Sequence, residues 1–402
     1  MAETDGKTSI NEEIRRSRPE DAEDITEAFQ NEYEKYYGKY VDSEELEAFL
    51  KVMNEELDGV SPDEVVGEWT VDEWSSDEAP EIVRTVEDSD GDFIGVGAIK
   101  FQDNLAELGS TIIREDDRSL RSSDTGRTVY SELFSDRLDT VSGMVADPDD
   151  PVDIAYTQLL ADKSAATQHV ANQHDFAVTG VYDKKFPMAY RGKGRVTVVD
   201  MIWADSHIEN EQEQVYVPEA AGDIVTTARD NINAKRDSSL DAITRTVNTA
   251  HTEHRNRNYK VKPKAVGDPM NFAEVQIVED ESGDYTWNDV LQEIGEAQSQ
   301  IQEDEDDQDY WIGLTLDANS PYLPTAAEEL EGLGFEYAGF NPGKIDHGEE
   351  NRDALEMQYR PSTETYEKQF VNEAADFIRD TGMSHGDTEA STGHETSEVM
   401  EI

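Results

Sequence analysis

The hydrophobic positions of this chain recur at two spacings, and each spacing predicts a different kind of element. Residues 14–33, "IRRSRPEDAEDITEAFQNEY", predict a strand and then a helix. Pro19 suits the first helical turn, and acidic residues follow it where the helix dipole favours them. A second helix is predicted over residues 43–56, whose apolar positions share one face. The breaks "DSDGD" and "QDN" divide residues 81–113 into three strands of a meander.

Helical and strand patterns continue to alternate beyond the meander. Val129, Leu133 and Leu138 stand near helical spacing in "GRTVYSELFSDRLDTV". The following pattern predicts a strand, a helix and two more strands, over residues 152–161, 163–175, 176–182 and 194–204. The resulting order, β-α-α-β-β-β-α-β-α-β-β, predicts an α+β (mixed α/β) fold with a mixed sheet.

The charge of the chain changes the expected environment. Lys and Arg number 34 against 92 Asp and Glu, which gives a net charge of −58 spread along the whole sequence. Such a charge repels itself in ordinary buffer, whereas at molar salt the screening length falls to about 3 Å. The 16 Tyr, 12 Phe and 5 Trp argue against a disordered acidic chain. We therefore expect a halophilic protein with no nucleic-acid partner, and we regard mimicry of nucleic acid as the weaker alternative.

Several kinds of chemistry are excluded or disfavoured by composition. The absence of cysteine excludes disulfides, thiolate metal sites and cysteine nucleophiles. His251 and His254 are spaced for one helical face, but a metal site would need a third ligand and usually the H-E-x-x-H spacing, so we expect a solvent-facing pair and no metal. The start, "MAETDGKTSINEE", has neither a basic region nor an apolar run, and no segment has the length of a membrane span. We therefore expect a cytoplasmic protein with no membrane partner, and its oligomeric state stays open.

Three stretches of the first half carry a family resemblance. "IRRSRPEDAEDI" looks like a first strand and helix, and "AELGSTIIREDDR" followed by "GRTVYSELF" looks like a cofactor-binding strand, loop and helix. "ATQHVANQHDFAVTGVY" looks like a helix that ends shortly before a Phe, and the strand after it. In this order the stretches resemble the GNAT N-acetyltransferase superfamily over residues 14–203. The resemblance implies a GNAT-like acyl-CoA N-acyltransferase fold.

The second half is similar to the first. "NFAEVQIVED" (271–280) matches "NLAELGSTII" (104–113), which places Glu274 opposite Glu107. We therefore expect a tandem of GNAT-like folds, as in a group of prokaryotic two-half GNAT proteins. The second fold is degenerate, because "EDESGDY" puts acids where a phosphate loop would lie. The expected boundaries are residues 10–205 for the first domain, 206–362 for the second, 363–380 for a C-terminal helix and 381–402 for a disordered acidic tail.

The resemblance implies acetyl-CoA as co-substrate of the first domain. Its pantetheine arm would pair with the fourth strand, and its pyrophosphate would lie at the start of the next helix, where free amides attract anions. The implied cofactor-binding residues are Ile112, Ile113, Arg118, Arg121, Ser122, Ser123, Gly126 and Arg127. The loop departs from the family pattern R/Q-x-x-G-x-G/A, because it contains one glycine. A solvated loop whose arginines pair with neighbouring acids is the open alternative.

Acetyl transfer requires a neutral amine, a donor to the oxyanion and an acid for the departing thiolate. The resemblance makes Glu107 the candidate base, and Tyr156 and Tyr182 are the candidate acids. The Tyr that the family commonly carries five residues before this Phe is Ala171 here. The alternatives are that Glu107 is an ordinary acid at the edge of a strand and that the two tyrosines are core aromatics. We expect an N-acetyltransferase acting on an unidentified amine, with a catalytically inactive ligand sensor or protein-interaction module as the alternative.

One basic patch stands out, "DKKFPMAYRGKGR", which includes Lys185, Lys193 and Arg195. Its glycines resemble a phosphate loop, but "VTVVDMIW" follows them, and this stretch favours a strand over a helix. We therefore expect a mobile loop between two strands. In GNAT folds this loop borders the acceptor pocket, which makes Lys193 and Arg195 candidates for the substrate side. A solvated loop is the alternative.

Overall fold

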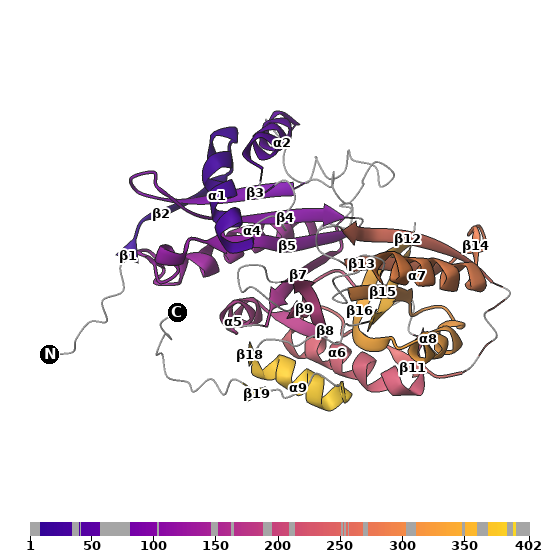
Figure 1. The fold of residues 1–402 in the computed structure, drawn as a ribbon. Helices are drawn as coiled ribbons and strands as arrows, with labels where there is room; N and C mark the ends of the chain where they lie inside the picture. The colour runs from indigo at the N-terminus through magenta and orange to yellow at the C-terminus, as the bar shows by residue number, and fades with distance from the viewer. Residues whose placement is uncertain are drawn as a thin grey trace. The chain divides into compact units, whose positions relative to one another are not determined.

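The structure is a computed structural model of the 402-residue chain (Figure 1). It describes residues 9–33, 40, 42–56, 81–102, 104–145, 152–161, 165–187, 195–208, 214–250, 252, 255, 257–267, 272–302, 311–347, 350–359, 369–383 and 389–390. The chain forms two compact units, one within residues 1–157 and one within residues 158–392. This division follows Thr157, whereas the sequence predicted a domain boundary after residue 205.

Unit 1 contains the predicted meander and its helices. Its elements are β1 (Ser9–Ile10), β2 (Glu12–Arg16), η1 (Pro19–Asp21), α1 (Ala22–Tyr33), α2 (Ser43–Glu56), β3 (Glu81–Asp88), β4 (Phe93–Gln102), β5 (Leu105–Ile113), η4 (Glu115–Asp117), β6 (Arg121–Ser122), α4 (Val129–Val145) and the start of β7 (Ile154–Leu160). Strands β2, β3, β4 and β5 are antiparallel neighbours in this order, and β5 pairs in parallel with the start of β7. The α+β class and the mixed sheet are therefore confirmed.

Helices cover both faces of the unit 1 sheet (Figure 1). Neighbouring side chains of a strand point to opposite faces, and β5 shows this clearly. Ile112 packs in a buried cluster with α1 and α2, and Ile113 packs in a second cluster with Val129 and Leu133 of α4. Both isoleucine side chains thus belong to the core, and only their backbone can face a ligand.

Unit 2 contains the end of β7 and all later described elements. They are α5 (Ala166–Gln173), β8 (Phe176–Pro187), β9 (Arg195–Trp203), β10 (Gln214–Tyr216), η6 (Glu219–Ala221), α6 (Gly222–Lys235), β11 (Thr246–Asn248), β12 (Asn258–Gly267), β13 (Phe272–Glu279), β14 (Tyr285–Thr286), α7 (Trp287–Gln302), β15 (Trp311–Asp317), α8 (Leu323–Gly332), β16 (Glu336–His347), β17 (Glu350–Tyr359), β18 (Gln369–Phe370), α9 (Asn372–Thr381) and β19 (Glu389–Ala390). Their main sheet has the order β14-β12-β13-β15-β17-β16-β8-β9. Figure 1 shows α6 and α9 side by side in this unit.

Two glycines join β8 to β16. Gly180 pairs with Gly339 in antiparallel register. A Cβ on Gly339 would lie 2.7 Å from the Cα of Gly180 and 2.8 Å from the carbonyl oxygen of Thr179. Side chains at this crossing would separate the strands, so the close approach requires glycine.

The order of elements repeats along the chain. The series β13, α7, β15, α8, β16, β17 follows the same order of strands and helices as β5, α4, β7, α5, β8, β9. Both series begin with a parallel pair, β5 with β7 and β13 with β15, and each pair includes a glutamate, Glu107 or Glu274. The sequence similarity between the two halves thus coincides with the same succession of elements.

The predicted C-terminal helix and tail differ in detail from the structure. The helix predicted over 363–380 is α9, which begins at Asn372. Within the predicted disordered tail, Glu389–Ala390 forms β19 and pairs with β18. The strand predicted after the glycines of the basic patch is β9, which confirms that no helix begins there.

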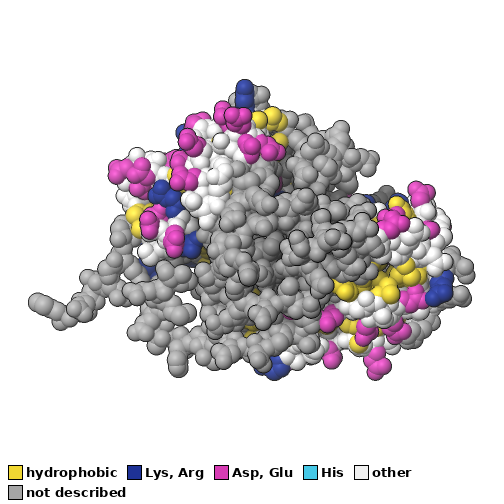
Figure 2. Space-filling view, in the orientation of Figure 1, with side chains coloured by type: hydrophobic (Ala, Val, Ile, Leu, Met, Phe, Trp, Pro, Cys, Tyr) yellow, Lys and Arg dark blue, Asp and Glu magenta, His cyan; other side chains and the backbone are white. Residues whose placement is uncertain are grey.

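Acidic side chains are scattered over the described surface in Figure 2, with fewer Lys and Arg among them. This distribution matches a charge that is spread along the sequence. Among the described residues, no helix is long and apolar enough to cross a membrane.

Candidate functional site

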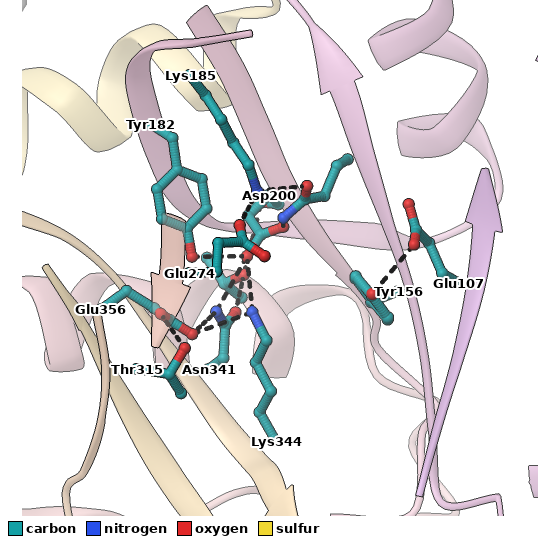
Figure 3. Close-up of polar contacts among 12 residues, drawn as sticks. Glu107, Tyr156, Tyr182, Lys185, Asp200, Glu274, Thr315, Asn341, Lys344 and Glu356 are labelled. Atoms are coloured by element: carbon teal, nitrogen blue, oxygen red, sulfur yellow. Dashed lines mark hydrogen bonds and ion pairs between the residues drawn. The ribbon is translucent and has the colours of Figure 1, made fainter. Parts of the chain in front are cut away.

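Glu107 and Tyr156 lie side by side in unit 1, as Figure 3 shows. They are partners in the parallel ladder between β5 and β7, and the Tyr156 hydroxyl donates a hydrogen bond to Oε2 of Glu107 at 3.2 Å. Both side chains are only partly buried. The structure thus brings together the candidate base and one candidate acid.

The ladder between β5 and β7 is short. It joins Leu105–Glu107 to Ile154–Tyr156, whereas β5 continues to Ile113. The next residue of β7, Thr157, donates its side-chain Oγ1 to the carbonyl oxygen of Leu108 at 2.8 Å. In the described part of unit 1, the backbone pairing of β5 with β7 thus ends at Glu107, and the next contact between the two strands is made by a side chain.

A β-bulge interrupts the pairing of β5 with β4 between Gly109 and Ile112. Ser110 and Thr111 stand opposite the single residue Gly97 of β4, and Ser110 has a φ of 47°. A non-glycine residue with a positive φ is uncommon and is frequently found at functional sites. The bulge reorients the backbone just before Ile112 and Ile113.

Arg137 of α4 supports this bulge from within the core. Its side chain is fully buried, and Nη1 donates to the carbonyl oxygens of Ala98 (3.0 Å) and Gly109 (2.9 Å) while Nε donates to that of Leu133 (3.2 Å). A Cβ on Gly97 would lie 2.9 Å from Cζ of Arg137, so glycine provides the space for the guanidinium. Burial lowers the pKa of Arg137 to about 10.

The predicted pyrophosphate loop forms hydrogen bonds within itself and with β1. The amides of the loop donate as follows: Ser122 to Arg127 O (2.9 Å), Ser123 to Ile10 O (2.7 Å), Asp124 and Thr125 to Ser122 Oγ (3.3 Å each), Gly126 to Ser122 O (2.9 Å) and Arg127 to Thr125 Oγ1 (3.2 Å). The start of α4 is also capped, because Ser131 N bonds Thr128 Oγ1 at 3.2 Å and the Thr125 hydroxyl bonds the Glu132 carboxylate. The amides that would receive a phosphate therefore already have partners.

The loop arginines differ in their contacts. Arg118 is exposed and donates from Nε to the carbonyl oxygen of Ile113 at 3.2 Å, and Arg121 donates from Nη1 to that of Gly126 at 2.8 Å. Ser123 is exposed and its hydroxyl bonds Oδ1 of Asn11. Arg127 is exposed next to the start of α4. The loop thus presents positive charge on a backbone that is closed to anions.

Tyr182 lies elsewhere, in a buried polar cluster of unit 2 (Figure 3). The labelled members of this cluster are Tyr182, Lys185, Asp200, Glu274, Thr315, Asn341, Lys344 and Glu356. The Tyr182 hydroxyl donates to Oδ2 of Asp200 at 3.4 Å, and burial, together with Glu356 and Asp200, raises its pKa well above the ordinary value. Its hydroxyl therefore stays protonated at neutral pH.

Two carboxylates and a lysine organise the centre of this cluster. Lys344 Nζ lies 3.0 Å from Glu356 Oε1 and 3.5 Å from Asp200 Oδ2. Burial by itself would lower the pKa of Lys344, but the two carboxylates outweigh it and raise the pKa above 10.5. Asn341 donates to Asp200 (3.0 Å) and Glu356 (3.3 Å), and Thr315 donates to Glu356 (2.9 Å). Each carboxylate thus contacts the Lys344 ammonium group and at least one neutral donor inside the protein.

The basic patch is only partly described. Lys193 lies outside the described residues, and Arg195 begins β9 with its side chain outside the description. Lys185 is in β8 with a buried side chain, so the expectation that it belongs to a mobile loop is wrong. Sequence reasoning also missed Arg137, which has acidic neighbours in the sequence and no local sign of burial.

Comparisons with known proteins give distant structural matches. No family model matches the chain, and no curated protein matches it. Mutant forms of the spermidine/spermine N-acetyltransferase of Vibrio cholerae match 48% of this chain and 92% of their own, at 17% identity and a TM-score of 0.33. The spermidine N-acetyltransferase of that organism in complex with CoA and spermine matches 48% and 94%, at 17% identity and a TM-score of 0.31. A GNAT-family acetyltransferase of Streptococcus pneumoniae matches 48% and 98%, at 16% identity and a TM-score of 0.32.

Proposed function

We propose that the chain is a tandem GNAT-like protein whose first fold binds acetyl-CoA and transfers the acetyl group to an amine. The observation that carries the proposal is the short ladder between β5 and β7, which ends at Glu107 and Tyr156 while β5 continues through a bulge. In the superfamily that the sequence resembles, the pantetheine arm pairs with this edge of the fourth strand. A strand whose described backbone ladder with β7 ends beside a carboxylate suits that role.

In the proposed reaction the amine nitrogen attacks the thioester carbon, and the C–S bond breaks to release CoA. Glu107 accepts the proton of the amine, directly or through water. The amide of Ile112 or Ile113 donates to the thioester oxygen, where negative charge develops. Tyr156 gives its hydroxyl proton to the departing CoA thiolate and regains one from Glu107, which its hydroxyl contacts at 3.2 Å.

The second fold lacks the features that support CoA binding in the first. The parallel ladder between β13 and β15 runs through six pairs, from Phe272–Trp311 to Ile277–Leu316. The Trp311 ring also covers Gly313, since a Cβ there would lie 2.3 Å from the indole. We therefore assign the second fold no CoA site, which agrees with the acids in its turn.

Phosphate binding in the first fold requires a rearrangement of the loop. Residues 122–127 must exchange internal hydrogen bonds for bonds to phosphate, with Arg121 and Arg127 supplying charge. Because that exchange offsets part of the binding energy, we expect weaker CoA binding than a glycine-rich loop gives.

Calorimetric titration with CoA and with acetyl-CoA in molar KCl tests the proposal. We expect binding in the wild type and at least tenfold weaker binding after Arg121→Ala with Arg127→Ala. The matched control is Arg379→Ala, which removes an exposed arginine of α9 and should leave binding unchanged. If neither CoA nor acetyl-CoA binds, the proposal is wrong.

The alternative is a catalytically inactive fold that senses a ligand or binds a protein. The internally bonded loop favours it, and so does Ala171, which is buried in α5 where the family commonly has Tyr. A screen of amine acceptors with a thiol-release assay separates the two functions. If the protein is an enzyme, Glu107→Gln should abolish acetyl transfer and keep acetyl-CoA binding. If it is an inactive fold, both the wild type and Glu107→Gln should bind acetyl-CoA without transferring the acetyl group.

A further inference from the structure

The ammonium group of Lys185 lies in a cage of four groups inside unit 2. Its Nζ is 2.5 Å from Oε1 of Glu274 and 2.9 Å from Oε1 of Gln158. It also lies 4.9 Å from the ring centroid of Tyr182 and 5.3 Å from that of Trp311. The lysine side chain is 3% exposed. A carboxylate, an amide oxygen and two aromatic rings are the groups that proteins use to recognise alkylammonium ions.

Three walls of this cage, Tyr182, Trp311 and Gln158, are held by contacts that do not involve Lys185. Trp311 Nε1 donates to Gln358 at 3.2 Å, and its ring meets the Tyr182 ring edge-on with centroids 5.8 Å apart. Gln158 Nε2 donates to Asp200 at 3.0 Å, which turns its amide oxygen toward the lysine. Such walls should persist when the lysine side chain is shortened.

Glu274 connects the cage to solvent, because its side chain is 29% exposed. It also stands on β13 where Glu107 stands on β5, in the parallel ladder after the first pairs. In the first fold that carboxylate is the proposed partner of the acceptor amine. In the second fold an amine of the chain itself already occupies the equivalent place.

We propose that the cage of Tyr182, Trp311, Glu274 and Gln158 is a binding site for a primary alkylammonium ion, and that Lys185 fills it as a built-in ligand. The cage itself stands on these contacts alone. Its interpretation as the closed acceptor site of the second fold rests on the proposed function.

Lys185→Ala tests the cage in the full-length chain. Alanine keeps Cβ, so the missing atoms are those of n-propylammonium, while 1-propanol has the same shape without charge. In molar KCl we expect n-propylammonium to raise the Tm of the variant saturably, by roughly 3–5 °C at tenfold excess over its Kd. Neither compound should do so for Lys260→Ala, which empties an exposed ion pair with Asp280. An equal effect of 1-propanol, or no effect of the amine, would overturn the proposal.

A second measurement decides the matter if Lys185→Ala does not fold. The chain contains no cysteine, so Lys185→Cys provides a single thiol that can be alkylated in denaturant. Aminoethylation rebuilds an ammonium of lysine length, and hydroxyethylation gives the neutral equivalent. We expect the first derivative to refold and the second to refold poorly, and equal refolding contradicts the proposal. Both experiments are independent of CoA, so the proposed enzymatic function can fail while the cage stands.

Discussion

Replacing Arg137 by methionine should destabilise unit 1 substantially. Methionine keeps an unbranched apolar side chain but removes the donors to the carbonyl oxygens of Ala98, Gly109 and Leu133. These oxygens lie beside the bulge and in the core, where water cannot replace the guanidinium. The substitution therefore tests whether the bulge of β5 depends on this one side chain.

The expected magnitude follows from two opposing contributions. Hydrogen bonds from a charged donor contribute about 1.5–3 kcal/mol each, which gives roughly 4.5–9 kcal/mol for three. The burial of the charge opposes this contribution: it lowers the pKa of Arg137 from 12.5 to about 10, which corresponds to roughly 3 kcal/mol. We therefore expect the free energy of unfolding to fall by roughly 1.5–6 kcal/mol.

Urea denaturation in molar KCl at neutral pH measures this loss. The matched control is Arg114→Met, because the Arg114 side chain is 48% exposed in its ion pair with Asp117 and should contribute less than about 1 kcal/mol. Hydrogen exchange should also accelerate at the amides of Ile112 and Ile113 in the Arg137 variant. If that variant is as stable as the Arg114 control, Arg137 does not hold the bulge.

Two further predictions concern unit 2. Gly339→Ala should lower the free energy of unfolding by about 1–3 kcal/mol. Gly180→Ala should lower it by less, because the atom nearest to a Cβ at position 180 is 3.1 Å away. Thermal denaturation of the two variants measures both losses, and equal losses would contradict the close-approach argument. Burial raises the pKa of Asp317 from 3.8 to about 6, despite its ion pair with Arg352. The folded protein therefore holds this proton more tightly than the unfolded chain does, and the free energy of unfolding falls as the pH rises from 3.8 to about 6. Asp317→Asn should therefore gain roughly 2 kcal/mol relative to wild type between pH 4 and pH 7. Urea titrations at both pH values would show no such change if Asp317 is ionised without penalty.

The fold was predictable where one local pattern decides an element. The helix predicted over residues 43–56 is α2 with the same bounds, because its apolar face is regular and its ends are polar. The strands of the meander and the strand after the basic patch were predictable for the same reason. The start of α9 at Asn372 was not predictable, because the residues before it carry no clear pattern that marks the beginning of a helix.

The site was predictable only in part, since its contacts depend on residues far apart in the sequence. Glu107 was identified from the strand that carries it and Tyr156 from a neighbouring strand, but the register that makes them partners was not predicted. The burial of Lys185 depends on Glu274, which lies 274 − 185 = 89 positions further along the chain. The closed loop likewise depends on Ile10, whose carbonyl oxygen receives the Ser123 amide. No local pattern encodes such partners.

The glycine contact between β8 and β16 has a consequence for synthesis of the chain. Gly180 leaves the ribosome 339 − 180 = 159 residues before its partner. At translation rates of about 5–20 residues per second, the edge of β8 waits roughly 8–30 s for β16. An unpaired strand edge is a template for association with other nascent chains. Because charge on an edge strand disfavours such association, we expect Asp183 and Lys185 of β8 to limit it during that interval, before the same side chains become buried.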